Sequence, residues 1–176
     1  MLISAMYLAI RLVLPLLSVV PLFSAEPIEA RFTGGVGRYV IDAGDAGYIS
    51  LSASVRTYVS QRWSVEPGFS MTRGNPYREY SVSCNFIKDF GGLGSRVRDA
   101  GSRVKPYGLI ALAYTRSSGS NPALGNLHQY PTIGAGMGVR IYLSDRIFVA
   151  PEVRLNLSLP SAEVTGSIGF VLRKSR

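Results

Sequence analysis

A thirteen-residue pattern occurs twice in this chain, and it constrains the fold more than any other feature. Both copies read Val-Arg-x-Tyr-x-Ser-x-Arg and continue with a Val and a Pro at fixed distances; they span residues 55–67 and, 84 positions later, residues 139–151. Each copy is two alternating runs joined by a three-residue polar turn, which is typical of a β-hairpin. Residues 80–87 and 164–171 are a related pair at the same offset. Two equivalent halves of about four strands each predict one closed sheet of about eight.

The predicted strands each have one apolar face and one small or polar face. In residues 49–59 the odd positions are mostly apolar, as at Ile49 and Leu51, whereas the even ones are polar, as at Ser50 and Arg56. Residues 63–72, 133–143 and 147–157 alternate in the same way. Side chains alternate across a strand, so the pattern fits either a soluble barrel with its apolar face inward or a transmembrane barrel with its apolar face towards lipid.

Three features favour the transmembrane arrangement. The polar faces are rich in Ser and Gly, which suit the narrow lumen of a small barrel. The strands have the roughly 9–11 residues that a tilted strand needs to cross a bilayer. Lys, which soluble sheets use to protect exposed edges, is nearly absent from the strands. The sequence therefore predicts an all-β fold, an eight-stranded antiparallel up-and-down transmembrane β-barrel.

The remaining strands follow less regular patterns. Residues 31–41 form a Gly-rich first strand whose inward face the pattern does not assign, and residues 105–116 are apolar on both faces. An even number of strands places both termini on one side of the membrane, which is expected to be the periplasmic side. The turns at 60–62 and 144–146 are expected on that same side. Outer loops are expected near 42–47, 73–78, 117–129 and 158–162. The connection at 89–104 is long, Gly-rich and basic for a periplasmic turn.

The amino terminus indicates export. Residues 12–23 are almost entirely apolar, are preceded by Arg11 and are followed by the small Ser24 and Ala25. Such a run is too short to span a bilayer as a helix and resembles a signal-peptide core. We therefore expect a signal peptide at residues 1–25 and one barrel domain at residues 26–176. An uncleaved anchor helix over residues 2–23 is the alternative.

Charge and cysteine content exclude some classes of protein. The single Cys84 permits no intramolecular disulfide, which excludes a disulfide-stapled secreted domain. The formal net charge is +8, but the cations are spread along the chain, so they do not indicate nucleic-acid binding. Anionic lipid headgroups fit these cations better than nucleic acid does, and a solvated surface without any partner is favoured over both.

Several motifs together resemble a known family. A Gly-x-Gly-x-Gly run leads into residues 139–146, and a Val-x-Pro-Glu strand follows. This region resembles the outer-membrane β-barrel family of small OmpA-, OmpX- and opacity-type proteins, and the likeness covers residues 31–174. The resemblance implies a Gram-negative-type outer membrane, with lipids including lipopolysaccharide and the outer-membrane assembly machinery as partners. It also implies roles ranging over adhesion, envelope integrity and small pores, with surface ligands that the pattern does not identify.

The sequence predicts no enzyme, and it offers no catalytic, cofactor-binding or metal-binding site. No Gly-x-Ser-x-Gly elbow, phosphate-binding loop or metal-spaced His/Cys set occurs. His128 is the only histidine. A lipid A deacylase, which is also an eight-stranded barrel, uses a His-x-Ser pair, whereas residue 130 in this chain is Tyr.

Charged side chains on the polar faces are the candidate functional residues. A symmetric turn at residues 60–62 would place Arg56 opposite Glu66. In the second hairpin, Arg140 would face residue 150, with Glu152 diagonal to it and Arg154 just above. Charges in a lipid-surrounded lumen must be paired or hydrated, so these pairs are interpreted as a structural plug or as the gate of a narrow pore.

Pro67 and Pro151 each predict a β-bulge. A structural or surface-interaction role is the main hypothesis; a narrow porin-like channel and a soluble periplasmic, lipocalin-like carrier are the alternatives.

Overall fold

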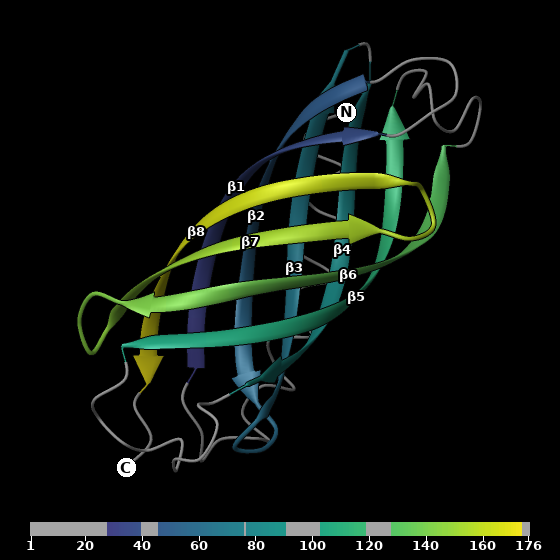
Figure 1. Cartoon of the computed structure of the whole chain (residues 1–176). Helices are drawn as coiled ribbons and strands as arrows, with labels where there is room; N and C mark the ends of the chain where they lie inside the picture. The colour runs from purple at the N-terminus through teal and green to yellow at the C-terminus, as the bar shows by residue number, and fades with distance from the viewer. Residues whose placement is uncertain (1–27, 40–45, 76, 91–102, 119–127, 174–176) are drawn as a thin grey trace.

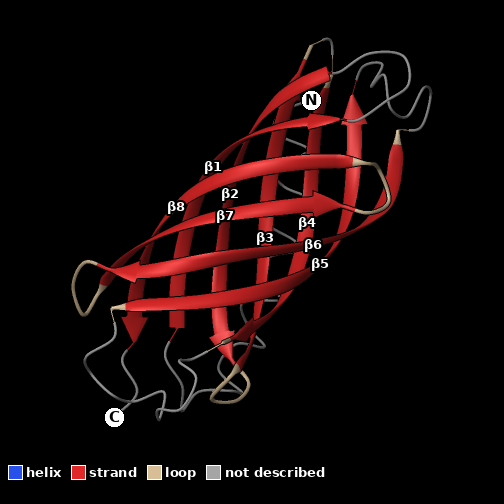
Figure 2. Cartoon of the chain, in the orientation of Figure 1, coloured by secondary structure: helices blue, strands red, loops and turns tan. Residues whose placement is uncertain are grey.

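The structure is a computed structural model, and it describes residues 28–39, 46–75, 77–90, 103–118 and 128–173. These residues form eight β-strands (Figure 2). The strands are β1 (Ile28–Tyr39), β2 (Ala46–Tyr58), β3 (Trp63–Gly74), β4 (Arg78–Asp89), β5 (Val104–Ser118), β6 (Gln129–Tyr142), β7 (Ile147–Asn156) and β8 (Ser161–Arg173). Among the described residues, no helix is long and apolar enough to cross a membrane.

The eight strands close into one antiparallel barrel in which each strand pairs with its neighbours in sequence and β8 pairs with β1 (Figure 1). Ile28 lies opposite Arg173, so the first and last described strand ends are at the same end of the barrel. We call this the terminal end; it also holds the turns after β2 and β6. The opposite end, where β3 meets β4 and β7 meets β8, is the loop end. The predicted eight-stranded up-and-down barrel is confirmed.

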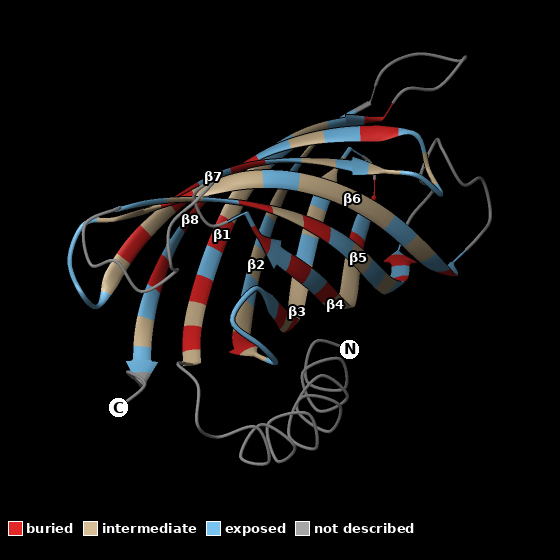
Figure 3. Cartoon of the chain, turned by 60° about the horizontal axis from the view of Figure 1, so that its bottom comes forward, coloured by how far each residue is buried: buried red, intermediate tan, exposed pale blue. Residues whose placement is uncertain are grey.

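The barrel wall is apolar outside and polar inside. Alternating buried and exposed positions run along the strands (Figure 3). Many large apolar side chains are exposed on the outer face, such as Met137 with 69% of its surface exposed. Buried polar and charged residues outnumber buried apolar ones among the described residues. This inversion is the one expected of a transmembrane barrel and does not fit a soluble carrier barrel with an apolar interior.

The repeated pattern folds into two equivalent hairpins. The backbone N–H of Val59 donates to the carbonyl of Trp63 at 2.9 Å, and that of Leu143 donates to Ile147 at 2.9 Å. In both turns, a serine side chain (Ser60 or Ser144) accepts from the first residue of the next strand. The symmetric turn is therefore confirmed, and it accounts for the repeat in the sequence.

The predicted bulges at the two strand prolines are wrong. Pairing of β3 with β4 continues in one register through Pro67, and pairing of β7 with β8 continues through Pro151. Each proline-containing strand is also paired along its other edge, in the β2–β3 and β6–β7 ladders. Each of these ladders lacks two successive residue pairs at the proline and then resumes in the same register. The missing N–H of proline thus interrupts one ladder without adding a residue to the strand.

The first strand begins earlier than its sequence pattern suggested. β1 starts at Ile28 rather than at residue 31, and its odd positions face inward, where Glu29, Arg31 and Thr33 are buried. The apolar inner face of β5 also has a structural reason: Leu109 packs in the lumen with Ile87, Tyr107, Phe148 and Ala150. The expected signal peptide at residues 1–25 and most of the 89–104 connection lie outside the described residues.

Candidate functional site

The lumen contains a network of buried charges, which we call the lumenal charge network. Its ion pairs join four arginines to four carboxylates among the described residues. The members are Arg31, Arg56, Arg140 and Arg154, with Glu29, Glu66, Asp89 and Glu152. Because the network contains equal numbers of positive and negative groups, it can be desolvated without leaving a net charge in the barrel.

Arg31 holds the middle of the network together. From β1, its Nη2 donates to Glu66 Oε1 on β3 at 2.6 Å, and its Nη1 donates to Glu152 Oε2 on β7 at 3.1 Å. Ser54 and Asn85 also donate to Glu66 Oε1, at 3.0 and 3.2 Å. Arg154 forms a further ion pair with Glu152. One guanidinium group thus joins two carboxylates from strands that are not neighbours.

Asp89 holds the part of the network nearer the terminal end. It is the last residue of β4 and is buried, and its Oδ1 accepts from Arg56 Nη2 at 2.9 Å and from Arg140 Nη2. Arg140 also pairs with Glu29 at 3.2 Å. Arg56 and Arg140 are the equivalent arginines of the two repeat copies, so both hairpins converge on one carboxylate.

Tyrosines fill the space around these arginines. The Tyr107 ring lies 5.9 Å from the Arg56 guanidinium carbon and 5.5 Å from that of Arg140, within the range of cation–π contacts. The Tyr107 hydroxyl donates to Glu152 Oε2 at 2.6 Å. Tyr107 therefore connects the Asp89 and Arg31 parts of the network, with its ring on one part and its hydroxyl on the other.

The five residues predicted from the sequence all lie inside the barrel, but they are not paired as predicted. Arg56, Glu66, Arg140 and Glu152 are each at most 2% exposed, and Arg154 is partly exposed. The predicted Arg56–Glu66 pair is wrong, because Arg56 pairs with Asp89 and Glu66 pairs with Arg31. Arg140 does not pair with its diagonal neighbour Glu152 but with Glu29 and Asp89. The Glu152–Arg154 contact is present.

Three members of the network were missed in the sequence. Glu29 and Arg31 lie on the strand whose inward face could not be assigned, and Asp89 was placed in a connection. The sequence does carry a signal for the first two: Glu29, Arg31 and Thr33 are successive polar residues at a spacing of two, between Ile28, Ala30 and Phe32. That alternation extends the strand backwards and marks the odd face as lumenal.

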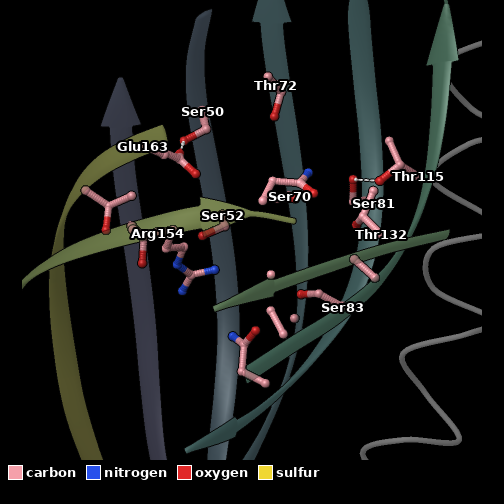
Figure 4. A pocket seen from close by; sticks show the side chains of 18 of the residues that line it. Ser50, Ser52, Ser70, Thr72, Ser81, Ser83, Thr115, Thr132, Arg154 and Glu163 are labelled. Atoms are coloured by element: carbon pink, nitrogen blue, oxygen red, sulfur yellow. Dashed lines mark hydrogen bonds between the residues drawn. The ribbon is translucent and has the colours of Figure 1, made fainter. Parts of the chain in front are cut away.

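The loop-end half of the lumen is a polar chamber. A cavity of about 160 Å³ is lined mainly by small hydroxyl side chains from several strands (Figure 4). The labelled serines and threonines lie around the space, with Arg154 and Glu163 on one side. Ser50 donates to Glu163, and the Ser81 and Thr115 hydroxyls are hydrogen-bonded at 2.7 Å. The terminal-end half is thus filled by long charged side chains, whereas this half retains space.

A buried carboxylate lies near the loop end of the chamber. Glu79 is 4% exposed and accepts from the Tyr39 hydroxyl at 3.0 Å and from the Tyr130 hydroxyl at 2.7 Å. The Tyr39 ring packs against Tyr48 and Tyr77, with centroids 5.0 and 5.9 Å away. His128 is exposed. Its neighbour two residues on, Tyr130, uses its hydroxyl to bind Glu79, which leaves no serine-type nucleophile in the His-x-Ser position.

Comparison with solved structures identifies proteins of the same shape. Neisserial surface protein A matches with a TM-score of 0.66 and 16% identity, over 82% of this chain and 97% of the other. The N-terminal barrel domain of OprF from Pseudomonas aeruginosa has a TM-score of 0.59 and 15% identity, over 81% and 96%. Ail, the attachment invasion locus protein of Yersinia pestis, has a TM-score of 0.50 and 15% identity, over 83% and 97%.

The chain has the fold of the small eight-stranded outer-membrane barrels. No protein-family model and no curated protein matches its sequence. The shared fold agrees with the resemblance drawn from the repeated hairpins. At 15–16% identity the likeness concerns the fold and leaves the lumenal residues of this chain to be interpreted from their own geometry.

Every carboxylate of the lumenal charge network is paired with an arginine. Among the described residues, no group of three or more His, Cys, Asp or Glu side chains could hold a metal ion. The paired charges can fix strands relative to one another across the lumen and can close it.

Proposed function

We propose that the protein is a small outer-membrane barrel with a structural or surface-interaction role, a closed lumen and no catalytic activity. It is exported by residues 1–25 acting as a signal peptide and is inserted by the outer-membrane assembly machinery. It then lies among outer-membrane lipids, including lipopolysaccharide. The loop end faces the outside, as expected for a barrel whose short turns are periplasmic.

The observation that carries this proposal is the lumenal charge network. Its side chains come from β1, β2, β3, β4, β6 and β7 and fill the terminal-end half of the lumen. Long side chains bound to one another across a narrow lumen leave no wide aqueous path and stiffen the wall. A scaffold of this kind can present loops outside the membrane, and the names of two proteins with the same fold refer to a surface protein and to attachment.

The location is tested by cell fractionation and by gel migration. The expected result is that the mature protein is recovered with outer membranes and that the unheated protein migrates differently from the heated protein. Recovery from the soluble periplasm would contradict the proposal.

A narrow pore is the second candidate, and the polar chamber favours it. The cavity of about 160 Å³ occupies the loop-end half, and the lumenal charge network, with the apolar cluster around Phe148, separates it from the terminal end. Single-channel recording in planar bilayers distinguishes the two functions. A closed scaffold gives no steady conductance, whereas a pore gated by the network conducts in discrete steps.

A further inference from the structure

Cations are concentrated on the outer face of three adjacent strands at the loop end. Arg73 on β3, Arg78 on β4 and Arg116 on β5 are exposed and point away from the lumen. We call them the arginine rim. Arg73 lies directly opposite Arg78, and Arg116 pairs with Tyr80, two residues further along β4. With strands about 4.8 Å apart, the three positions spread over roughly 10 Å of the barrel surface.

Nothing in the described structure neutralises the arginine rim. All six carboxylates within the strands face the lumen; they are Glu29, Glu66, Glu79, Asp89, Glu152 and Glu163. No ion pair is formed by Arg73, Arg78 or Arg116 with any residue that the structure describes. Like charges placed directly opposite on neighbouring strands destabilise a sheet, so an external anion bound by Arg73 and Arg78 together would stabilise the barrel at this point.

A shallow recess lies below the rim on the same three strands. It has a volume of about 240 Å³ and is bounded on the outer face by Pro67, Val82, Cys84, Leu112 and Tyr114. Cys84 is six residues along β4 from Arg78, which is about 20 Å of strand. At a strand tilt near 45° this corresponds to a depth of roughly 14 Å, about half of a 30 Å hydrocarbon core. The recess therefore lies near the middle of the membrane, below the rim and displaced sideways from it along the tilted strands.

We propose that the arginine rim and the recess form one docking site for a phosphorylated glycolipid, whose phosphates bind the rim and one of whose acyl chains lies in the recess. Guanidinium groups bind phosphate through paired N–H donors. The three guanidinium groups of the arginine rim, spread across three strands, suit a headgroup with more than one phosphate better than a phospholipid with a single phosphate. The inference rests on the proposed membrane location and adds to it a specific site on the barrel wall, with the residues that would bind the phosphates and the acyl chain.

The test is lipid binding to the folded protein in neutral detergent, measured by native mass spectrometry. The probes are diphosphoryl lipid A, monophosphoryl lipid A and phosphatidylglycerol. The expected result is a saturable one-to-one complex whose affinity falls in that order. Arg73→Gln with Arg78→Gln should weaken diphosphoryl lipid A binding by at least about tenfold, because charge-assisted hydrogen bonds are lost.

Matched variants separate specific docking from general charge. Arg62→Gln with Arg146→Gln removes the same charge from exposed turns at the terminal end and should leave binding unchanged. Cys84→Phe fills the recess and should weaken binding, whereas Val153→Phe, on the outer face of β7, should not. If the rim double variant does not fold, as judged by gel migration, Arg116→Gln replaces it.

Three results would overturn the inference. The first is an equal loss of diphosphoryl lipid A binding in the two double arginine variants. The second is equal binding of phosphatidylglycerol and diphosphoryl lipid A, and the third is undiminished binding of diphosphoryl lipid A by Cys84→Phe. Because binding is measured on purified protein, it is independent of cell fractionation. A protein found outside the outer membrane would refute the proposed function without deciding whether the docking site exists.

Discussion

Asp89→Asn should leave a buried charge without a partner in the lumenal charge network. The variant keeps the size of the side chain but removes the negative charge that accepts from both Arg56 and Arg140. Arg140 retains Glu29 as a partner at 3.2 Å. Arg56 loses the ion pair that it makes in the described structure and is 2% exposed, so its charge is left buried and uncompensated.

Breaking a buried ion pair from one side typically costs about 3–5 kcal/mol, because the stranded charge is not rehydrated. Since Arg140 keeps one partner, we expect Asp89→Asn to lower the free energy of unfolding by about 3–4 kcal/mol. Adding Arg56→Met removes the stranded charge while keeping apolar volume. The double variant should therefore recover about 1–3 kcal/mol, the usual coupling energy of contacting residues.

The measurement is urea-induced unfolding in lipid vesicles, followed through the fluorescence of Trp63, the only tryptophan. The same cycle with Glu66→Gln and Arg56→Met is the control, because Glu66 pairs with Arg31 and not with Arg56. Coupling in the Arg56–Asp89 cycle and none in the Arg56–Glu66 cycle is the expected outcome. The reverse result would refute the pairing across the lumen and restore the simple hairpin pairing.

Three further predictions test the wall and its orientation. Ile110→Arg places a cation on the lipid face in the middle of β5 and should lower the free energy of unfolding by about 2–4 kcal/mol. Val59→Arg, beside a turn, should lower it by at most about 1 kcal/mol. Equal losses in the two variants would contradict the membrane placement. Gly138→Ala should destabilise by about 1–3 kcal/mol, because a new Cβ meets the Tyr107 ring and the Pro151 carbonyl, whereas Gly166→Ala, with open space around its Cβ, should be nearly neutral in the same unfolding assay. A membrane-impermeant maleimide should label Cys84 only after heat denaturation, and ready labelling of the folded protein would show that Cys84 does not face lipid.

The faces of the strands could be predicted from the sequence because the period of two is local. Leu51 and Ser52 must point to opposite sides of β2 whatever the rest of the barrel does. The register of the repeated hairpins was predictable for a similar reason, since a short turn fixes which residues are opposite. These local rules explain why the apolar outer face and the five lumenal residues could be predicted, and the repeat of the hairpin explains why the strand number could be.

The ion-pair partners could not be predicted, because long side chains reach across the lumen rather than along one hairpin. Arg56 and Glu66 are on adjacent strands, yet Arg56 reaches Asp89 on β4 and Glu66 receives Arg31 from β1. Which side chains meet depends on the stagger with which the barrel closes, and no single hairpin contains that information. The same limit applies to Gly138, because the Tyr107 ring that lies against its backbone comes from the neighbouring strand β5.

The distribution of charge connects the basic composition to the closed lumen. The strands place six carboxylates inside with Arg31, Arg56, Arg140, Arg154 and the half-buried Lys105, so the interior is close to neutral. Neutrality is required there, because an excess buried charge would have to be desolvated without a partner. The surplus behind the formal charge of +8 must therefore lie where water or lipid headgroups can reach it. The arginine rim, on the outer face at the loop end, has that position, and an anionic lipid surface is the environment in which such a rim stabilises the folded barrel rather than destabilising it.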